Sequence, residues 1–189
     1  MSGARAVFFD RDGTLMEDAH YCADPARVRV YAGVSEALAR LKRAGFRVIV
    51  VSNQSGIGRG LITEEQYRAV EREFQRQAGA GNIDASYFCP DPPGNASPRR
   101  KPETGMITEA AADFGLDLGD SFLIGDKTSD IECGRRAGMK TIQVLTGYGR
   151  EQQAGADFTV ADVVAAVEIV LRVSAESQTS NTTSRPRNC

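Results

Sequence analysis

Five short, mainly apolar segments alternate with amphipathic segments along most of this chain. The apolar segments are AVFF (6–9), FRVIVV (46–51), ASYF (85–88), SFLIG (121–125) and TIQVL (141–145). Strands that lack a polar face are typical of a parallel sheet covered by helices on both sides. The pattern therefore predicts an α/β fold with one doubly wound, mostly parallel sheet flanked by helices.

The segments between these strands carry helical patterns with clear ends. In VSEALARLKRAG the apolar residues share one stripe, and Gly45 follows where a helix C-terminus is expected. Thr63 and Gln66 have the spacing of a capping box at the start of TEEQYRAVEREFQRQAG. Two further helices are expected to end at Gly115 and Gly138, and a last one covers ADVVAAVEIVLRV.

Two segments depart from this alternation. Residues 89–102, CPDPPGNASPRRKP, hold five of the seven prolines, which predicts a rigid loop. Residues 174–189 are polar and without periodicity, so we expect a single domain over 1–173 and a disordered C-terminal tail over 174–189. No large insertion separates the first three strands, and we therefore expect no large cap domain.

Composition and charge exclude several classes of function. The 189 residues carry a formal net charge of -2, which gives no overall attraction to nucleic acid or to an anionic membrane. No apolar run reaches the ~20 residues of a membrane span, and no secretory signal pattern opens the chain. The four cysteines form no CxxC pair, so we expect reduced thiols and a cytoplasmic protein. Nothing indicates oligomerisation, and a monomer is expected.

Charged and polar residues cluster after the predicted strands. They are Asp10, Asp12 and Thr14 after the first, Ser52 and Asn53 after the second, Arg100 and Lys101 at the end of the proline-rich loop, and Asp126, Lys127 and Asp130 after SFLIG. The carboxyl ends of parallel strands meet at one edge of a doubly wound sheet, where ligands bind. We therefore expect these residues to converge on one site.

Such a mixture of charges suits phosphoryl transfer. Asp10 and Asp126 would repel each other unless a cation lies between them, and Mg²⁺ prefers oxygen ligands of this kind. Lysine and arginine cannot ligate that metal, but they can hold a phosphate beside it. Ser52 and the backbone amides after it can bind the remaining phosphoryl oxygens. A free carboxylate can then act as the nucleophile.

Four stretches, FFDRDGT, VVSNQSG, RRKP and IGDKTSD, resemble the four motifs of the haloacid dehalogenase superfamily of phosphatases. The resemblance covers roughly residues 5–150. DRDGT, SNQSGIGRG, RKP and GDK together resemble the branch that contains the histidinol-phosphatases and heptose-bisphosphate phosphatases. Within it, they are most similar to the D-glycero-D-manno-heptose 1,7-bisphosphate 7-phosphatases, which supply heptose precursors for lipopolysaccharide and other glycans.

The resemblance implies a role for each matching residue. Asp10 is the nucleophile, and Asp12 protonates the leaving sugar oxygen and then activates the hydrolytic water. Mg²⁺ is held by the Asp10 and Asp126 carboxylates and by the backbone carbonyl of Asp12. Lys101 neutralises charge at the nucleophile and phosphate, while Ser52 and Asn53 hold the transferring phosphoryl group.

Further residues are implied to contact the substrate. Arg100 matches a position that reads the substrate's second phosphate, and Lys127 contacts substrate or orients the preceding aspartate. The remaining implied contacts are Asp18, His20, Tyr21, Asn53, Gln54 and Ser55. Independently of the resemblance, an extended backbone would turn Arg11 away from the two acids beside it. The roles of Arg59 and Asp130 stay open.

The proline-rich loop departs from the family pattern. Many relatives bind a structural zinc there through a Cys-x-His and a Cys-x-Cys pair. Here Cys89 is present, Asp91 stands at the histidine position, and no second cysteine pair follows. Because a closed tetrahedral site needs four ligands, we expect no zinc. The prolines can supply rigidity instead, which leaves the exact shape of this loop open.

Three other functions remain as alternatives. A histidinol-phosphate phosphatase is the nearest, although the Arg100–Lys101 pair favours a doubly anionic substrate. A nucleic-acid 3′-phosphatase is disfavoured by the acidic charge balance. A receiver-type phospho-acceptor module would also use paired acids, Mg²⁺ and a lysine. Such a module accepts one phosphoryl group, whereas a phosphatase turns over many times.

Overall fold

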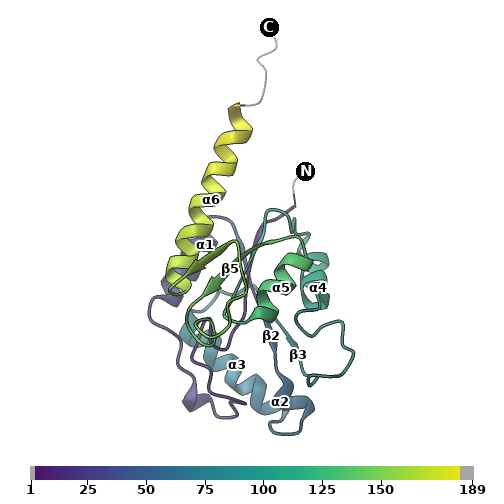
Figure 1. Ribbon diagram of the computed structural model, residues 1–189. Helices are drawn as coiled ribbons and strands as arrows, with labels where there is room; N and C mark the ends of the chain where they lie inside the picture. Colours follow the sequence, from purple (N-terminus) through teal and green to yellow (C-terminus); the bar gives the residue numbers. More distant parts are fainter. Residues whose placement is uncertain (1–2, 184–189) are drawn as a thin grey trace.

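The computed structural model describes residues 3–183, with side chains described up to residue 176 (Figure 1). Six parallel strands form one sheet in the order β3-β2-β1-β4-β5-β6. The strands are β1 (Ala6–Phe9), β2 (Arg47–Asn53), β3 (Ala85–Cys89), β4 (Phe122–Gly125), β5 (Lys140–Val144) and β6 (Phe158–Val160). The predicted α/β fold with a parallel, doubly wound sheet is confirmed.

Helices cover both faces of the sheet. One face is covered by α1 (Val34–Arg43), α3 (Glu64–Ala78) and α6 (Val163–Thr183), and the other by α4 (Gly105–Phe114) and α5 (Thr128–Arg136). Figure 1 shows α4 and α5 side by side and α6 extending well beyond the sheet. The short helices η1 (Pro25–Arg27) and α2 (Ser55–Gly58) lie in loops.

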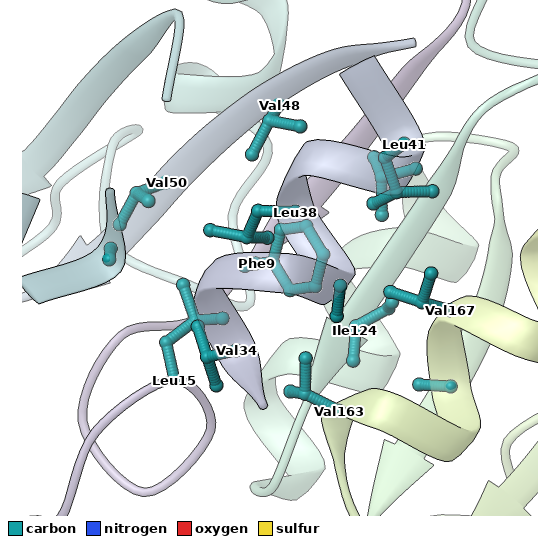
Figure 2. Close-up of a cluster of buried hydrophobic side chains, with 14 of the residues drawn as sticks. Phe9, Leu15, Val34, Leu38, Leu41, Val48, Val50, Ile124, Val163 and Val167 are labelled. Atoms are coloured by element: carbon teal, nitrogen blue, oxygen red, sulfur yellow. The ribbon is translucent and has the colours of Figure 1, made fainter. Parts of the chain in front are cut away.

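Strand β1 joins the two cores because its side chains alternate between the faces of the sheet. Val7 and Phe9 pack with α1 and α6, whereas Ala6 and Phe8 pack toward α4 and α5, and all four are fully buried. Figure 2 shows Phe9 among side chains of α1 and α6, including Leu38 and Val167. Burying one phenylalanine side chain contributes about 1.5–3 kcal/mol. This burial on both faces fixes the place where β1 ends, and therefore the position of the next residue, Asp10.

Local signals set several helix ends as predicted. The Thr63 hydroxyl accepts from the Gln66 amide at 3.1 Å, while the Gln66 side chain accepts from the Thr63 amide at 2.8 Å. Gly115 ends α4 in the left-handed conformation, with φ of 61°. The expected capping box and glycine end are thus confirmed.

The C-terminal part differs from the prediction. Disorder was expected over 174–189, but α6 continues past residue 173 to Thr183, and residues 184–189 lie outside the described residues. The last turns of α6 are polar, so the sequence shows no apolar periodicity that would predict a helix there. Their residue types still allow a helix that has already formed to continue. Strand β6 was also not predicted, because three half-buried or exposed residues give no apolar run.

The segments between the early strands carry no inserted domain. Residues 10–46 hold only η1 and α1, and residues 54–84 hold only α2 and α3. The site at the edge of the sheet is therefore bordered by loops of the same domain. Among the described helices, none combines the length and the apolarity that crossing a membrane requires.

Candidate active site

The predicted residues meet at the carboxyl edge of the sheet. Asp10 follows β1 directly, Ser52 and Asn53 are the last residues of β2, and Asp126 follows β4. A cavity of about 320 Å³ opens at this edge. Its lining includes Asp10, Asp12, Asp18, His20, Tyr21, Ser52, Asn53, Gln54, Ser55, Arg100, Lys101 and Lys127. Asp126 lies fully buried behind it.

Lys101 is the central cation of the site. Its Nζ lies 2.6 Å from Asp10 Oδ1, 2.8 Å from Asp130 Oδ1 and 2.6 Å from the Val51 carbonyl oxygen. Burial alone would lower the pKa of Lys101, but the charges of Asp10 and Asp130 outweigh it and raise that pKa above its usual range. The lysine therefore stays charged beside the carboxylate of Asp10.

The carboxylate of Asp10 is ionised by the same arrangement. Burial would raise its pKa, but Lys101 and then Lys127 outweigh this effect and hold the pKa below its ordinary value. The carboxylate therefore meets one requirement of a nucleophile at neutral pH, which is to be unprotonated.

Asp126 packs against two glycines that allow its close approach. A Cβ at Gly13 would lie 2.4 Å from Asp126 Oδ2, and one at Gly147 would lie 2.2 Å from it. The Tyr148 amide donates to Oδ2 at 2.9 Å, and the Thr14 hydroxyl donates to Oδ1 at 3.3 Å. Burial, followed by the nearby Asp10 charge, raises the pKa of Asp126 to about 7.

The acids fit a divalent cation. Oxygens of Asp10, Asp126 and Asp130 lie within 4.8 Å of one another, and Asp10 Oδ2 is buried without a hydrogen-bond partner. Asp130 is less available, because Lys101 contacts one of its oxygens and the Lys127 amide donates to the other at 3.0 Å. The Asp10 and Asp126 carboxylates therefore remain the predicted donors, and they offer oxygen ligands of the type that Mg²⁺ prefers.

We predict that Mg²⁺ binds more weakly as the pH falls below neutrality. The proton on Asp126, whose pKa is about 7 without metal, competes with the cation for the same carboxylate. Each pH unit below 7 should weaken apparent affinity by up to roughly tenfold, as expected for one competing proton. Calorimetric titration with MgCl₂ between pH 5.5 and 8 measures this. Affinity that does not change over this range would contradict the prediction.

Asp12 lies in a separate hydrogen-bond network. Gln54 Nε2 donates to Asp12 Oδ2 and to the Ser52 hydroxyl oxygen, both at 2.7 Å. Arg11 was expected to turn away from the acids, and this was wrong: its Nη2 lies 3.2 Å from Asp12 Oδ1 and 3.0 Å from Oδ2. The backbone bends after β1, so the alternation of an extended chain does not continue there.

Asn53 lines the cavity, but its side-chain amide is hydrogen-bonded to the backbone of Lys101. Its side-chain oxygen accepts from the Lys101 amide and its nitrogen donates to the Lys101 carbonyl, both at 3.0 Å. This pair of bonds ties the end of β2 to the loop that carries Lys101. Contact of Asn53 with the phosphoryl group stays a prediction.

The segment from Asp18 to Tyr21 forms one rim of the cavity. His20 and Tyr21 have φ of 42° and 47°, a conformation that residues with a Cβ seldom adopt. The Asp18 carboxylate accepts from the His20 amide at 3.0 Å and lies 3.6 Å from Lys127 Nζ. The Tyr21 ring packs on Gly56. These contacts hold the predicted substrate residues at the cavity.

The proline-rich loop places Arg100 at the other rim. Its Nη1 donates to the Asp91 carbonyl at 2.7 Å. The buried Cys89 thiol has Asp91 Oδ2 and Ser97 Oγ as neighbours, each at 3.5 Å. Within the described residues these groups do not form a closed set of metal ligands, and the absence of zinc stays a prediction.

Several cavity residues were missed by the sequence analysis. They are Arg11, Cys22, Ser129, Tyr148 and Gln152. Tyr148 is the most informative of these, because Lys127 Nζ lies 5.0 Å from the centre of its ring and His20 packs edge-on against it. It comes from the loop after β5, and the rule that ligands bind after the strands could have identified it.

The chain is similar in sequence to known hydrolases. A family model described as HAD-hydrolase-like matches residues 98–168. The D-glycero-D-manno-heptose-1,7-bisphosphate 7-phosphatase of Chlorobaculum tepidum is 37% identical over 80% of this chain and 83% of its own length. The D-glycero-alpha-D-manno-heptose-1,7-bisphosphate 7-phosphatase of Burkholderia mallei is 40% identical over 75% of this chain and 79% of its own.

A solved structure supports the same assignment. The D,D-heptose 1,7-bisphosphate phosphatase from B. bronchiseptica, complexed with magnesium and phosphate, superposes with a TM-score of 0.82 at 29% identity. The alignment covers 89% of this chain and 99% of that one. The chain therefore belongs to the haloacid dehalogenase-like hydrolases, in the family of the D-glycero-D-manno-heptose 1,7-bisphosphate 7-phosphatases.

Proposed function

We propose that this phosphomonoester hydrolase removes the C7 phosphate of D-glycero-D-manno-heptose 1,7-bisphosphate, a step toward nucleotide-activated heptose. The observation that carries the proposal is the meeting of Asp10, Asp12, Ser52, Lys101 and Asp126 at one sheet edge. The names of the relatives supply the substrate.

The chemistry follows from the positions of two acids. The Asp10 carboxylate attacks phosphorus, an aspartyl-phosphate bond forms, and the bond from phosphorus to the sugar oxygen breaks. Asp12 starts as the protonated acid and gives its proton to that oxygen; the resulting carboxylate then accepts a proton from the water that attacks the aspartyl-phosphate and breaks its bond to Asp10. Phosphate leaves and both acids return to their starting states.

Charge neutralisation requires several cations. Asp10, Asp126 and the Asp12 carbonyl would hold Mg²⁺, which when bound offsets the negative charge of the carboxylates and phosphoryl oxygens. Lys101 stabilises charge at the nucleophile, and Ser52 binds a phosphoryl oxygen. Arg100 and Lys127 both line the cavity and can bind the second phosphate of a sugar bisphosphate.

The test measures phosphate release with Mg²⁺ from a substrate panel. The panel holds both C1 anomers of the heptose bisphosphate, fructose 1,6-bisphosphate and histidinol phosphate. We expect at least a ~10-fold preference in kcat/KM for one heptose anomer, about 1.4 kcal/mol of transition-state discrimination. Phosphorus NMR should show that the C7 phosphate is lost and the C1 phosphate kept. Equal rates over the panel would overturn the heptose assignment.

We further propose a monomer that acts in the cytoplasm on a small-molecule substrate and binds neither nucleic acid nor a membrane. The buried Cys22, Cys89 and Cys133 are free thiols, in keeping with a reducing compartment. The net charge of -2 offers no field for a polyanion. Light scattering of the purified protein tests the oligomeric state.

A further inference from the structure

The buried side chain of Arg11 connects α3 to the proposed acid of the reaction. Its Nη2 contacts both oxygens of Asp12, and its Nη1 lies 2.9 Å from Glu71 Oε2 on α3. Arg11 is only 1% exposed, and its guanidinium lies over the rings of Tyr67 and Phe74, at 5.2 and 6.0 Å from their centres. One planar group thus spans two carboxylates.

Glu71 holds the Arg11 guanidinium on the side away from Asp12, and Glu71 is itself held by Gln75. Glu71 is 9% exposed, and its second oxygen accepts from Gln75 Nε2 at 3.1 Å. Burial alone would lower the pKa of Arg11. The negative charges of Asp12 and Glu71 outweigh it and raise that pKa, so the guanidinium remains charged. A buried arginine with two carboxylates keeps a fixed orientation, because its donors form a rigid fork.

Arg11 and Glu71 have no part in the chemistry proposed above. Within the described residues, neither side chain forms a hydrogen bond or ion pair with Asp10, Lys101 or Asp126. If the arginine only completed the core, an apolar side chain would fill the space without the cost of burying a charge. Instead, the Arg11 guanidinium contacts Asp12, and this is the carboxyl group that must face the leaving oxygen in a defined orientation.

We propose that Arg11 and Glu71 are positioning residues that hold the Asp12 carboxylate for proton transfer. Glu71 orients Arg11, and Arg11 fixes both oxygens of Asp12 from the side of α3. Gln54 contacts the same carboxylate from the side of β2. This inference rests on the proposed role of Asp12 as the proton donor and acceptor.

The test compares two leaving groups. A sugar phosphate needs a proton on its departing oxygen, whereas p-nitrophenyl phosphate releases a stable anion and needs little assistance. For Glu71→Ala we expect kcat/KM to fall ~10-fold or more on the sugar bisphosphate and less than ~3-fold on p-nitrophenyl phosphate, since misplaced catalytic groups lose up to ~100-fold. Glu71→Gln keeps an acceptor for Arg11 and should recover most of the loss.

Control variants separate positioning from damage to the fold. Glu73→Ala changes another carboxylate of α3, which contacts Arg76 and Gln77, and should leave both rates unchanged. In an Asp12→Asn background, Glu71→Ala should have no further effect on the sugar substrate, because it acts through Asp12. Equal losses on both substrates, or a full additional loss in the double variant, would overturn the proposal.

The Asp12→Asn variant also separates this inference from the proposed function. A selective loss on the sugar substrate in Asp12→Asn but not in Glu71→Ala overturns the positioning role alone. If Asp12→Asn itself shows no selective loss, the proton-transfer role of Asp12 fails, and the inference fails with it.

Discussion

Asp10→Asn is expected to reduce phosphate release by on the order of 10⁵-fold or more, as loss of a nucleophile does in other hydrolases. The amide has nearly the size of the carboxylate, and its oxygen can still accept from Lys101, so the fold should be retained. It cannot supply the anionic oxygen that attacks phosphorus. Steady-state phosphate release with saturating Mg²⁺ at neutral pH measures the loss, and circular dichroism checks the fold.

The matched control is Asp120→Asn, an identical chemical change at an exposed aspartate outside the cavity. It should keep full activity. Acid-quenched enzyme should carry a covalent phosphate in the wild type and none in Asp10→Asn. Residual activity above roughly 1% in Asp10→Asn would assign the nucleophile elsewhere, since an uncharged amide cannot replace it. A wild-type reaction that stops after one phosphoryl group would instead favour a receiver-type module.

The sequence was sufficient to predict the edge of the sheet at which the site forms. Strands β1 and β4 are buried on both faces, so their ends are fixed by packing, and the first polar residue after each must lie at the carboxyl edge. Asp10 after β1 and Asp126 after β4 follow this rule directly. The capping box of α3 was equally readable, because it depends on residues only three positions apart.

Contacts between side chains that are far apart in the sequence could not be predicted from such local patterns. Arg11 and Glu71 are 60 positions apart, and no local pattern shows that an arginine beside an aspartate will be buried against α3. Asn53 likewise fits a phosphate-binding motif, yet its amide binds the backbone of Lys101 in the folded chain. Which partner such a side chain selects depends on the packing of whole elements, which the spacing of residues does not encode.

Lys101→Met should be the most destabilising single change at the site. Lys101 is 3% exposed and is the ammonium group that contacts both Asp10 and Asp130. Methionine fills similar space but leaves these carboxylates buried beside Asp126 without that charge. Removing one partner of a buried ion pair costs about 3–5 kcal/mol in the free energy of unfolding. Urea unfolding of the metal-free protein at pH 8 measures this loss.

The loss should depend on pH in a defined direction. Asp126 and Asp130 already have raised pKa values, about 7 for Asp126, and removing Lys101 favours their protonation further. Between the ordinary carboxyl pKa of 3.8 and these raised values, the folded state binds more protons than the unfolded state, so stability falls as pH rises. The deficit of Lys101→Met is therefore largest at pH 8 and smaller at pH 5.5.

Two further variants show whether charge is the cause. Adding Asp130→Asn to Lys101→Met removes one unpaired carboxylate and should recover part of the stability, with a coupling energy of about 0.5–3 kcal/mol between the two sites. Lys140→Met, at a half-buried lysine whose ammonium lies over the Phe122 ring, should change stability by no more than about 0.5 kcal/mol. If Lys101→Met lost the same stability at both pH values and Asp130→Asn recovered none, the lysine would act by packing alone, and the buried acids would not need its charge.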